Sequence, residues 1–215
     1  MDGKLELISL KGRGRAEAVR LMLTFAEKRF IDSRLTLDQW KMKKKREGLP
    51  DDTKLPILLI NDRTKIVGVN DISRHVAEQL NLYGSTAEHR RSIDDVIAAL
   101  EELHKGLTPI VRATLIKNFD ERRELWNNFK NDQLFPCLKN FEHQLAKTAF
   151  LVGTRFVIFQ ISWADIALIE MLTRFQCCYD SFYLAHFPIL KERCNRFESL
   201  PNMRPYIQSR PDSHF

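Results

Sequence analysis

The sequence predicts a small α/β domain over residues 1–82 and an all-helical domain over residues 87–215. Short apolar runs bounded by turn residues, which are typical of strands, gather in the first of these regions. The segment Tyr83-Gly84-Ser85-Thr86 breaks the composition and is typical of a linker. Beyond it, apolar residues recur at helical spacing and no convincing strand pattern appears. A chain of 215 residues can bury one large core or two modest ones, which is compatible with this division.

The chain opens with a strand, a tight turn and a helix over residues 4–17. Both faces of the strand are mostly apolar, as expected of a buried central strand. Gly12 and Gly14 permit the positive φ that a sharp reversal needs, and helical spacing begins at Arg15. This arrangement puts Ser9 at a strand end beside the start of a helix, where free N–H groups favour an anion or a thiolate.

Four further elements complete the first domain. We expect a parallel second strand at Arg29–Leu35 and then a polar stretch at Leu37–Pro50 that forms a short irregular helix or loop. An antiparallel hairpin of Pro56–Ile60 with Lys65–Val69 follows, and a helix begins after a cap at Asn70 or Asp71. The order β-α-β, linker, β-β-α predicts a four-stranded mixed sheet in the thioredoxin-like arrangement.

The second domain reads as a series of helices. The first runs from Ala87 to about Ile116 with a bend at Pro109, and the second covers Asp120–Lys147. Ser162 and Asp165 form a capping box that starts the next helix. The last two helices are expected from Phe187-Pro188 to Phe197 and between Pro201 and Pro205.

The net charge of +6 lies mainly in the first domain, where residues 1–82 hold 17 basic against 12 acidic side chains. Lys41, Lys43, Lys44, Lys45 and Arg46 form one basic cluster without interleaved aromatic residues. A solvated face is the first interpretation of this cluster, an anionic small ligand the second and nucleic acid the last. We therefore expect no nucleic-acid partner.

Composition also bounds the location and the kind of site. No apolar run reaches the roughly 20 residues needed to span a bilayer, and the first residues lack the apolar core of a signal peptide. We expect a cytoplasmic protein without a membrane partner. The four cysteines form no Cys-x-x-Cys pair and no helix carries His-x-x-x-His, so no metal site is predicted.

Several separate motifs resemble one family. They are a Gly-Arg-Gly-Arg-Ala-Glu-x-x-Arg run after the first strand, Trp40 with Lys44, Leu55-Pro56, Ser162-Trp163-Ala164-Asp165, and Ser209-Arg210-Pro211. Together they resemble the sigma-class glutathione transferases, which include the glutathione-dependent prostaglandin D synthases. The resemblance implies the glutathione transferase fold, a homodimer, glutathione as co-substrate and a hydrophobic electrophile as second substrate.

The resemblance also implies a set of site residues. Arg15 would stand beside the thiol, where its charge favours the thiolate. Trp40 and Lys44 would hold the glycyl end of glutathione, and a cis Pro56 would turn the Leu55 backbone toward the ligand. The implied glutathione-binding residues are Trp40, Lys44, Lys54, Leu55, Pro56 and Asn70. The plainer alternatives are a tryptophan packed at the domain edge beside a surface lysine, and a proline that merely begins a strand.

Three departures weaken the implied site. Ser9 stands where the family has its catalytic tyrosine, and its short side chain reaches the same point only through a water or a shifted ligand. Gly68-Val69 replace a Gln-Ser pair, although a slip of one residue brings Asn70 into the serine role. Ala98 replaces an acidic residue that the family lends across its dimer, with Asp94 or Asp95 one turn earlier. An apolar insertion at Thr154–Gln160 has no physical explanation.

Two functions follow. The first is a glutathione transferase that conjugates or isomerises hydrophobic electrophiles, with Ser9 or a bound water stabilising the thiolate and Arg15 lowering its pKa. The second is a non-catalytic protein of the same fold that binds hydrophobic ligands or serves a structural or partner-binding role. The first is favoured, because Trp40 and Lys44 have less reason to persist on an inactive scaffold.

Overall fold

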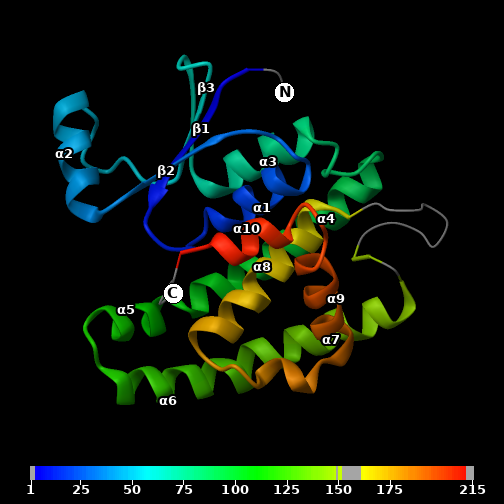
Figure 1. Cartoon of the computed structure of the whole chain (residues 1–215). Coiled ribbons are helices and arrows are strands. Elements are labelled where there is room, and N and C mark those ends of the chain that lie inside the picture. The colour runs from blue at the N-terminus through cyan, green and yellow to red at the C-terminus, as the bar shows by residue number, and fades with distance from the viewer. Residues whose placement is uncertain (1–2, 149, 152–160, 212–215) are drawn as a thin grey trace. The chain divides into compact units, whose positions relative to one another are not determined.

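The computed structural model describes residues 3–148, 150–151 and 161–211, and its contacts divide the chain into two units (Figure 1). Unit 1 comprises Met1–Leu80 and Pro201–Ser213, and unit 2 comprises Asn81–Leu200 with His214–Phe215. The predicted domains, 1–82 and 87–215, differ from these units mainly at the C-terminal end, because the segment from Pro201 groups with the first unit.

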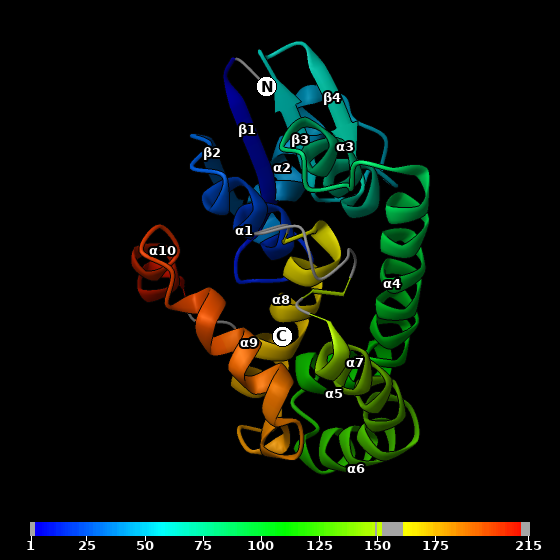
Figure 2. The ribbon, with the colours of Figure 1, turned by 90° about the vertical axis from the view of Figure 1, so that its right-hand side faces the viewer.

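Unit 1 is a four-stranded mixed sheet with helices. Its elements are β1 (Leu5–Leu10), α1 (Glu17–Phe25), β2 (Ile31–Leu35), α2 (Leu37–Glu47), β3 (Ile57–Ile60), β4 (Thr64–Val67), α3 (Val69–Gln79) and α10 (Arg204–Ser209). The strand order is β2-β1-β3-β4, with β1 and β2 parallel and the other pairs antiparallel (Figure 2). The predicted thioredoxin-like arrangement is confirmed.

β1 is the central strand that the sequence predicts. Leu5, Leu7 and Ser9 are buried, and so is Ile8 on the opposite face, whereas Leu10 at the end of the strand is 41% exposed. Ile8 packs against α2, while α1 and α3 pack together. Because successive side chains of a strand point to opposite faces, Ser9 points away from the face that α2 covers.

Two local expectations in unit 1 were wrong. The polar stretch after β2 is a regular helix rather than an irregular one, because Thr36 and Gln39 form a capping box and Gly48 ends α2 in the left-handed conformation. α3 begins at Val69, directly after Gly68, which has a φ of +97°. No side chain caps the start of this helix. Asn70 and Asp71 therefore lie inside the first turn of α3 and do not cap it.

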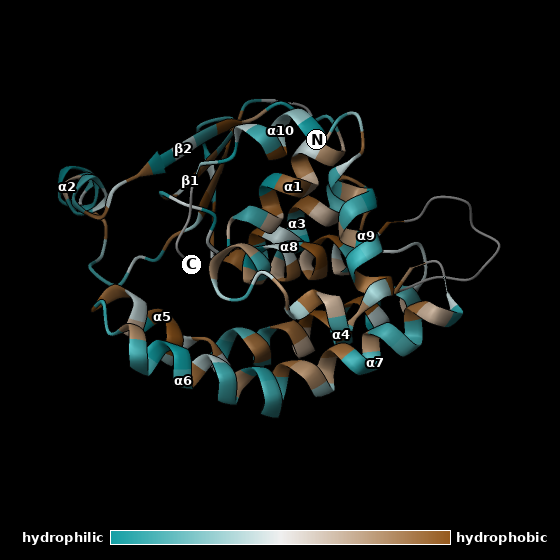
Figure 3. Ribbon diagram, turned by 60° about the horizontal axis from the view of Figure 1, so that its bottom comes forward, coloured by the Kyte–Doolittle hydropathy of each residue, from teal (hydrophilic) through white to brown (hydrophobic). Residues whose placement is uncertain are grey.

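Among the described residues of unit 2, every regular element is a helix. Its elements are α4 (Ala87–Gly106), α5 (Thr108–Leu115), α6 (Phe119–Phe129), the π-helix η1 (Lys130–Leu134), α7 (Phe135–Lys147), α8 (Trp163–Cys178), the 3-10 helix η2 (Tyr183–His186) and α9 (Pro188–Glu198). α8 is buried on nearly all sides and packs against α4 and α9. Much of it is brown in Figure 3, as expected of a central helix.

The helix boundaries in unit 2 depart from the prediction at two prolines. The bend expected at Pro109 is a break, because α4 ends at Gly106 and α5 carries the proline in its first turn, where no N–H is needed. Pro136 follows the π-turn that separates α6 from α7, since proline cannot donate within a continuous helix. The insertion at Thr154–Gln160 lies outside the described residues.

The predicted capping box at the start of α8 is confirmed. Ser162 accepts a hydrogen bond from the backbone N–H of Asp165, and the Asp165 carboxylate accepts one from the N–H of Ser162. The same carboxylate also accepts hydrogen bonds from the Ser162 hydroxyl, at 2.6 Å, and from the N–H of Leu151, at 2.9 Å. Among the described residues, no helix is both long enough and apolar enough to cross a membrane.

Candidate functional site

The turn after β1 has the conformation that its glycines predict. Gly12 and Gly14 adopt φ values of +94° and +51°, which residues with a Cβ atom rarely adopt. The reversed chain carries the backbone carbonyl of Arg13 to 3.0 Å from the guanidinium of Arg20 in α1. This turn therefore places the end of β1 beside the first turns of α1.

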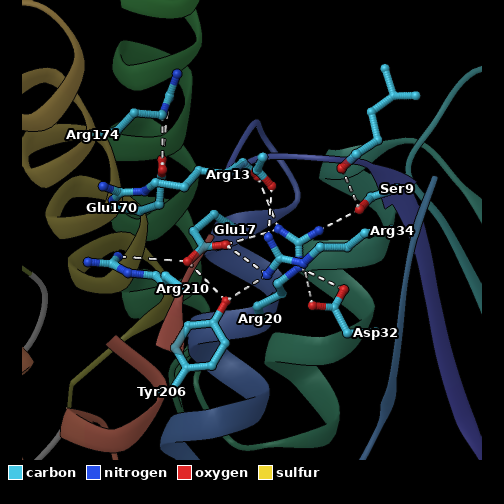
Figure 4. Close-up of polar contacts among 12 residues, drawn as sticks. Ser9, Arg13, Glu17, Arg20, Asp32, Arg34, Glu170, Arg174, Tyr206 and Arg210 are labelled. Atoms are coloured by element: carbon cyan, nitrogen blue, oxygen red, sulfur yellow. Dashed lines mark hydrogen bonds and ion pairs between the residues drawn. The ribbon is translucent and has the colours of Figure 1, made fainter. Parts of the chain in front are cut away.

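Ser9 lies buried at this point, with 3% of its surface exposed. Its hydroxyl oxygen accepts a hydrogen bond from the Arg20 guanidinium, and its proton is directed to the carbonyl oxygen of Leu10 at 3.1 Å. Arg20 has no exposed surface. The hydroxyl that the sequence places in the thiol site is thus engaged as both donor and acceptor within unit 1 (Figure 4).

Arg20 ties three elements together. Its Nη1 donates to Glu17 in α1 at 2.9 Å, and its Nε donates to Asp32 in β2 at 2.9 Å. Glu17 is fully buried, and the side chain of Asp32 is 25% exposed. A buried guanidinium is tolerated only where its donors are matched in this way. The two carboxylates therefore hold Arg20 in the orientation that reaches Ser9.

Side chains from β2 and the C-terminal segment close the same cluster. Arg34, which pairs with Ser9 in the strand register, donates to Asp32 at 2.7 Å and to the carbonyl of Gly12 at 2.9 Å. The Tyr206 hydroxyl donates to Glu17 at 3.0 Å. Arg210 lies 3.7 Å from the same carboxylate. We call these residues the arginine cluster: Ser9, Glu17, Arg20, Asp32, Arg34, Tyr206 and Arg210.

The arginine cluster carries a positive excess, because three guanidinium groups face the two carboxylates of Glu17 and Asp32. Burial opposes the charge of Arg34, but its hydrogen bond to Asp32 and the charge of that carboxylate outweigh burial and raise its pKa. Burial and the neighbouring charge of Glu17 raise the pKa of Tyr206, so its hydroxyl stays a proton donor. An anion near Ser9 would be stabilised by the excess charge.

Trp40 and Lys44 lie on the other face of the sheet. Trp40 is 6% exposed and packs with Ile8 and Ile57, and half-buried Leu55 lies against the same cluster. The Lys44 ammonium stands 5.9 Å from the centre of the Trp40 ring and donates to the carbonyl of Asp51 at 2.6 Å. Three of the predicted glutathione-binding residues are therefore gathered, although Trp40 serves as core as well.

The remaining predicted site residues are spread around this face and the turn. The peptide bond between Leu55 and Pro56 is cis, as the resemblance implies. Lys54 is exposed just before it, and Asn70 is exposed in α3. Arg15 is exposed in the turn before α1. Their part in ligand binding stays a prediction.

Ser9 is the one member of the arginine cluster that the sequence predicts as a site residue. Glu17 and Arg20 are part of the quoted motif, and their opposite charges three positions apart on an otherwise apolar helix were an available signal. Asp32 and Arg34 stand on either side of Ser33 in the middle of a short strand, where nothing local marks them as site residues. The contact of Tyr206 with Glu17 spans 189 residues and has no signal in the sequence.

Several ionisable residues of unit 2 make contacts within that unit. The Tyr83 hydroxyl donates to the carboxylate of Asp94 at 2.7 and 2.8 Å, so this suggested substitute for the missing acidic residue is already bound. Glu170 and Arg174 form a buried ion pair within α8, at 2.9 Å. Arg174 also lies 2.8 Å from Nε2 of His104 in α4, which accepts because its Nδ1 donates to the carbonyl of Leu100.

Comparisons with known proteins agree on one family. Residues 106–210 match the family described as "Glutathione S-transferase, C-terminal domain". Glutathione S-transferase A2 of Bos taurus is 30% identical over 220 residues, covering 97% of this chain and 89% of its own. The class-mu 26 kDa isozyme 1 of Fasciola hepatica is 29% identical, covering 93% and 84%. The solved prostaglandin synthase D of Nilaparvata lugens superposes with a TM-score of 0.80 at 20% identity, covering 97% of this chain and all of that one.

Proposed function

Because the chain belongs to the glutathione S-transferase family, we propose that it binds glutathione on unit 1. The bound glutathione is conjugated to a hydrophobic electrophile or used to isomerise it. The observation that carries this proposal is the gathering of Trp40, Lys44 and Leu55 on one face of unit 1. Lys44 gives one of its three donors to Asp51, so two remain for a ligand carboxylate. We infer that the Leu55 backbone, just before β3, pairs with a peptide ligand in the manner of an added strand.

The arginine cluster supplies the electrostatics of thiol activation. A free thiol of the cysteine type ionises near a pKa of about 8.5, so a thiolate at neutral pH needs a nearby positive charge or a donor. The Arg20 guanidinium donates to Ser9, which polarises the hydroxyl and makes its proton a stronger donor. Rotation of that proton from the Leu10 carbonyl toward a bound sulfur would stabilise the thiolate. Arg20 acts through Ser9 in this scheme and is a positioning residue.

One observation favours the second candidate function, a non-catalytic ligand-binding or partner-binding protein. Ser9 is almost fully buried, and both of its hydrogen bonds are made within unit 1. Donation to a sulfur requires the loss of the bond to Leu10 and the approach of the ligand to a covered oxygen. A scaffold that had lost catalysis would keep this serine as a structural residue.

Glutathione binding by calorimetry near pH 7 separates the two. The transferase proposal expects a dissociation constant between micromolar and low millimolar, followed by conjugation of a test electrophile such as 1-chloro-2,4-dinitrobenzene above the uncatalysed rate. Binding without conjugation would support the non-catalytic function on an intact glutathione site. No heat at several millimolar glutathione would overturn the transferase proposal.

The finer assignments rest on the resemblance and on family membership. We infer a sigma-like class from the motif at residues 12–20. We infer a homodimer because members of the family commonly dimerise, and a cytoplasmic location from the composition. Sedimentation velocity at micromolar protein would test the dimer. A monomer at every concentration would remove the basis for an acidic residue lent by a partner.

A further inference from the structure

α2 is the most basic of the described elements of unit 1. Among its 11 residues, five basic side chains stand against two acidic ones, and most of the helix is teal in Figure 3. The basic residues are Lys41, Lys43, Lys44, Lys45 and Arg46, and the acidic residues are Asp38 and Glu47. The helix therefore carries a net charge of +3, the difference between five and two.

Both ends and the inner side of α2 are fixed. The capping box of Thr36 and Gln39 holds its start, and Gly48 ends it in the left-handed conformation. Trp40 is buried and packs with Ile8 of β1, so the helix cannot turn about its axis without losing this contact. The basic run is therefore presented to a partner as one defined face of a helix.

Four side chains form the side of α2 that faces away from Trp40. An α-helix turns by about 100° per residue, so Lys41, Met42, Lys45 and Arg46 lie within about 80° of the direction opposite Trp40. All four are exposed, and Met42 is 65% exposed. We call these four residues the outer face of α2. Met42 precedes Lys45 and Arg46 by three and four positions, so it lies among the cations.

The other two lysines of α2 have contacts on its inner side. Lys43 donates to the carboxylate of Glu47, one turn further on, at 2.6 Å. Lys44 donates to the carbonyl of Asp51 at 2.6 Å. Lys43 and Glu47 thus balance each other within the helix, and the remaining charges belong to the outer face.

The outer face keeps a positive excess. Asp38 at its start lies 3.8 Å from Lys41, but both side chains are largely exposed, and such a pair contributes little. Arg46 lies 3.5 Å from the carboxylate that Lys43 already holds. Lys45 forms no ion pair with any residue that the structure describes. Three cations and an exposed methionine are therefore available to an anionic surface.

We propose that the outer face of α2 docks on a lipid bilayer that contains anionic phospholipids. Clusters of four to eight basic residues favour such bilayers, and each of these residues strengthens binding about fivefold. Met42 enters the headgroup region between the cations, a contact that a nucleic acid does not reward, because phosphate oxygens need only donors. The expectation of no membrane partner followed from the lack of a spanning run, which surface docking does not require. The proposal is independent of the transferase activity.

Cosedimentation of the full-length protein with vesicles at low salt is the test. We expect binding to vesicles that mix phosphatidylcholine with phosphatidylserine and no binding to phosphatidylcholine alone. Lys45→Gln should weaken binding about fivefold, and Lys41→Gln combined with Lys45→Gln about 25-fold. Lys191→Gln is the matched control, since it makes the same charge change at an exposed lysine of α9, and less than a twofold change is expected.

Met42 separates a bilayer from other anionic partners. Met42→Trp should strengthen vesicle binding about threefold and shift the emission to shorter wavelength on binding, because tryptophan favours the membrane interface. Met42→Ser should weaken vesicle binding about threefold. Binding to a polyglutamate peptide or to duplex DNA depends on charge, so neither change at Met42 should alter it.

The melting temperature of each variant shows that it is folded, and Met42→Phe replaces Met42→Trp if the latter is not. Three outcomes would overturn the proposal. They are no binding to the anionic vesicles at low salt, equal vesicle binding by the wild type and the double lysine variant, and binding of DNA or polyglutamate in place of the vesicles.

Discussion

The guanidinium of Arg20 donates a hydrogen bond to the hydroxyl oxygen of Ser9, and both side chains are buried. The resemblance to the sigma-class family implies that Ser9 stands where that family has its catalytic tyrosine, and this equivalence stays a prediction. The contact therefore decides how this position is interpreted: the serine is an acceptor for a fixed positive charge before it can be a donor to any ligand.

Replacing Ser9 by Ala should lower the free energy of unfolding by about 1–3 kcal/mol, because a buried Nη2 of Arg20 loses its acceptor. Urea denaturation followed by circular dichroism measures the change. Ser209→Ala is the matched control, since that hydroxyl is exposed and donates only to the carbonyl of Tyr206, so we expect less than about 0.5 kcal/mol. Equal stability of Ser9→Ala and the wild type would mean that Arg20 finds another partner.

Replacing Ser9 by Tyr should raise the conjugation rate if the transferase proposal holds, because a phenol restores a donor with longer reach. The assay is conjugation of glutathione to 1-chloro-2,4-dinitrobenzene near pH 7, on protein shown to be folded. Ser9→Ala should lower the rate. Unchanged rates in both variants would place Ser9 outside the thiol site and leave it a structural residue.

Replacing Lys44 by Gln should weaken glutathione binding about tenfold or more, since a hydrogen bond from a charged donor to a carboxylate is lost. Lys45→Gln is the control on the same helix, because Lys45 is exposed and lies outside the proposed site. Calorimetry on both variants gives the two dissociation constants. If Lys45→Gln weakens binding as much as Lys44→Gln, the basic helix attracts glutathione without a specific site.

Alkaline pH should destabilise the folded protein. Burial raises the pKa of Tyr179, Tyr183 and Tyr206 above the value of about 10 that an exposed tyrosine has. The unfolded chain then releases protons that the folded chain keeps. The free energy of unfolding is therefore unaffected by these groups below about pH 10 and falls as the pH rises further.

Urea denaturation at pH 8, 9.5 and 11 measures this slope. Tyr206→Phe should reduce it, because one of the three groups no longer titrates, and should lower stability at pH 8 by about 0.5–1.5 kcal/mol through the lost bond to Glu17. A slope as steep in Tyr206→Phe as in the wild type would show that Tyr206 ionises at an ordinary pKa.

Replacing Glu170 by Gln should lower the free energy of unfolding by about 3–5 kcal/mol, because the buried guanidinium of Arg174 loses its counter-charge. The double replacement Glu170→Leu with Arg174→Met removes both charges and should cost less than the single change. Denaturation of the single and double variants gives the coupling between the two residues. A double variant less stable than Glu170→Gln would mean that the contact of Arg174 with His104 is the more important one.

Much of the fold was available from local patterns. The period of apolar residues marked β1 and the hairpin of β3 and β4, and Gly12 and Gly14 marked the turn, because the side-chain period and a positive φ are properties of a few neighbouring residues. The capping box of Ser162 and Asp165 was readable for the same reason. The motifs also identified the family, and family membership carried the expectation of glutathione.

Only the tertiary structure decided which side chains of the candidate site form hydrogen bonds with one another. The sequence shows Ser9, Arg20 and Tyr206 as unrelated residues, and folding makes Arg20 a donor to Ser9 and brings Tyr206 to Glu17. Trp40 could have been exposed or core, and packing against Ile8 buried it. These outcomes depend on which distant groups satisfy a buried charge or fill a cavity. Such choices are made by the whole packed unit, since a buried guanidinium must find every partner at once.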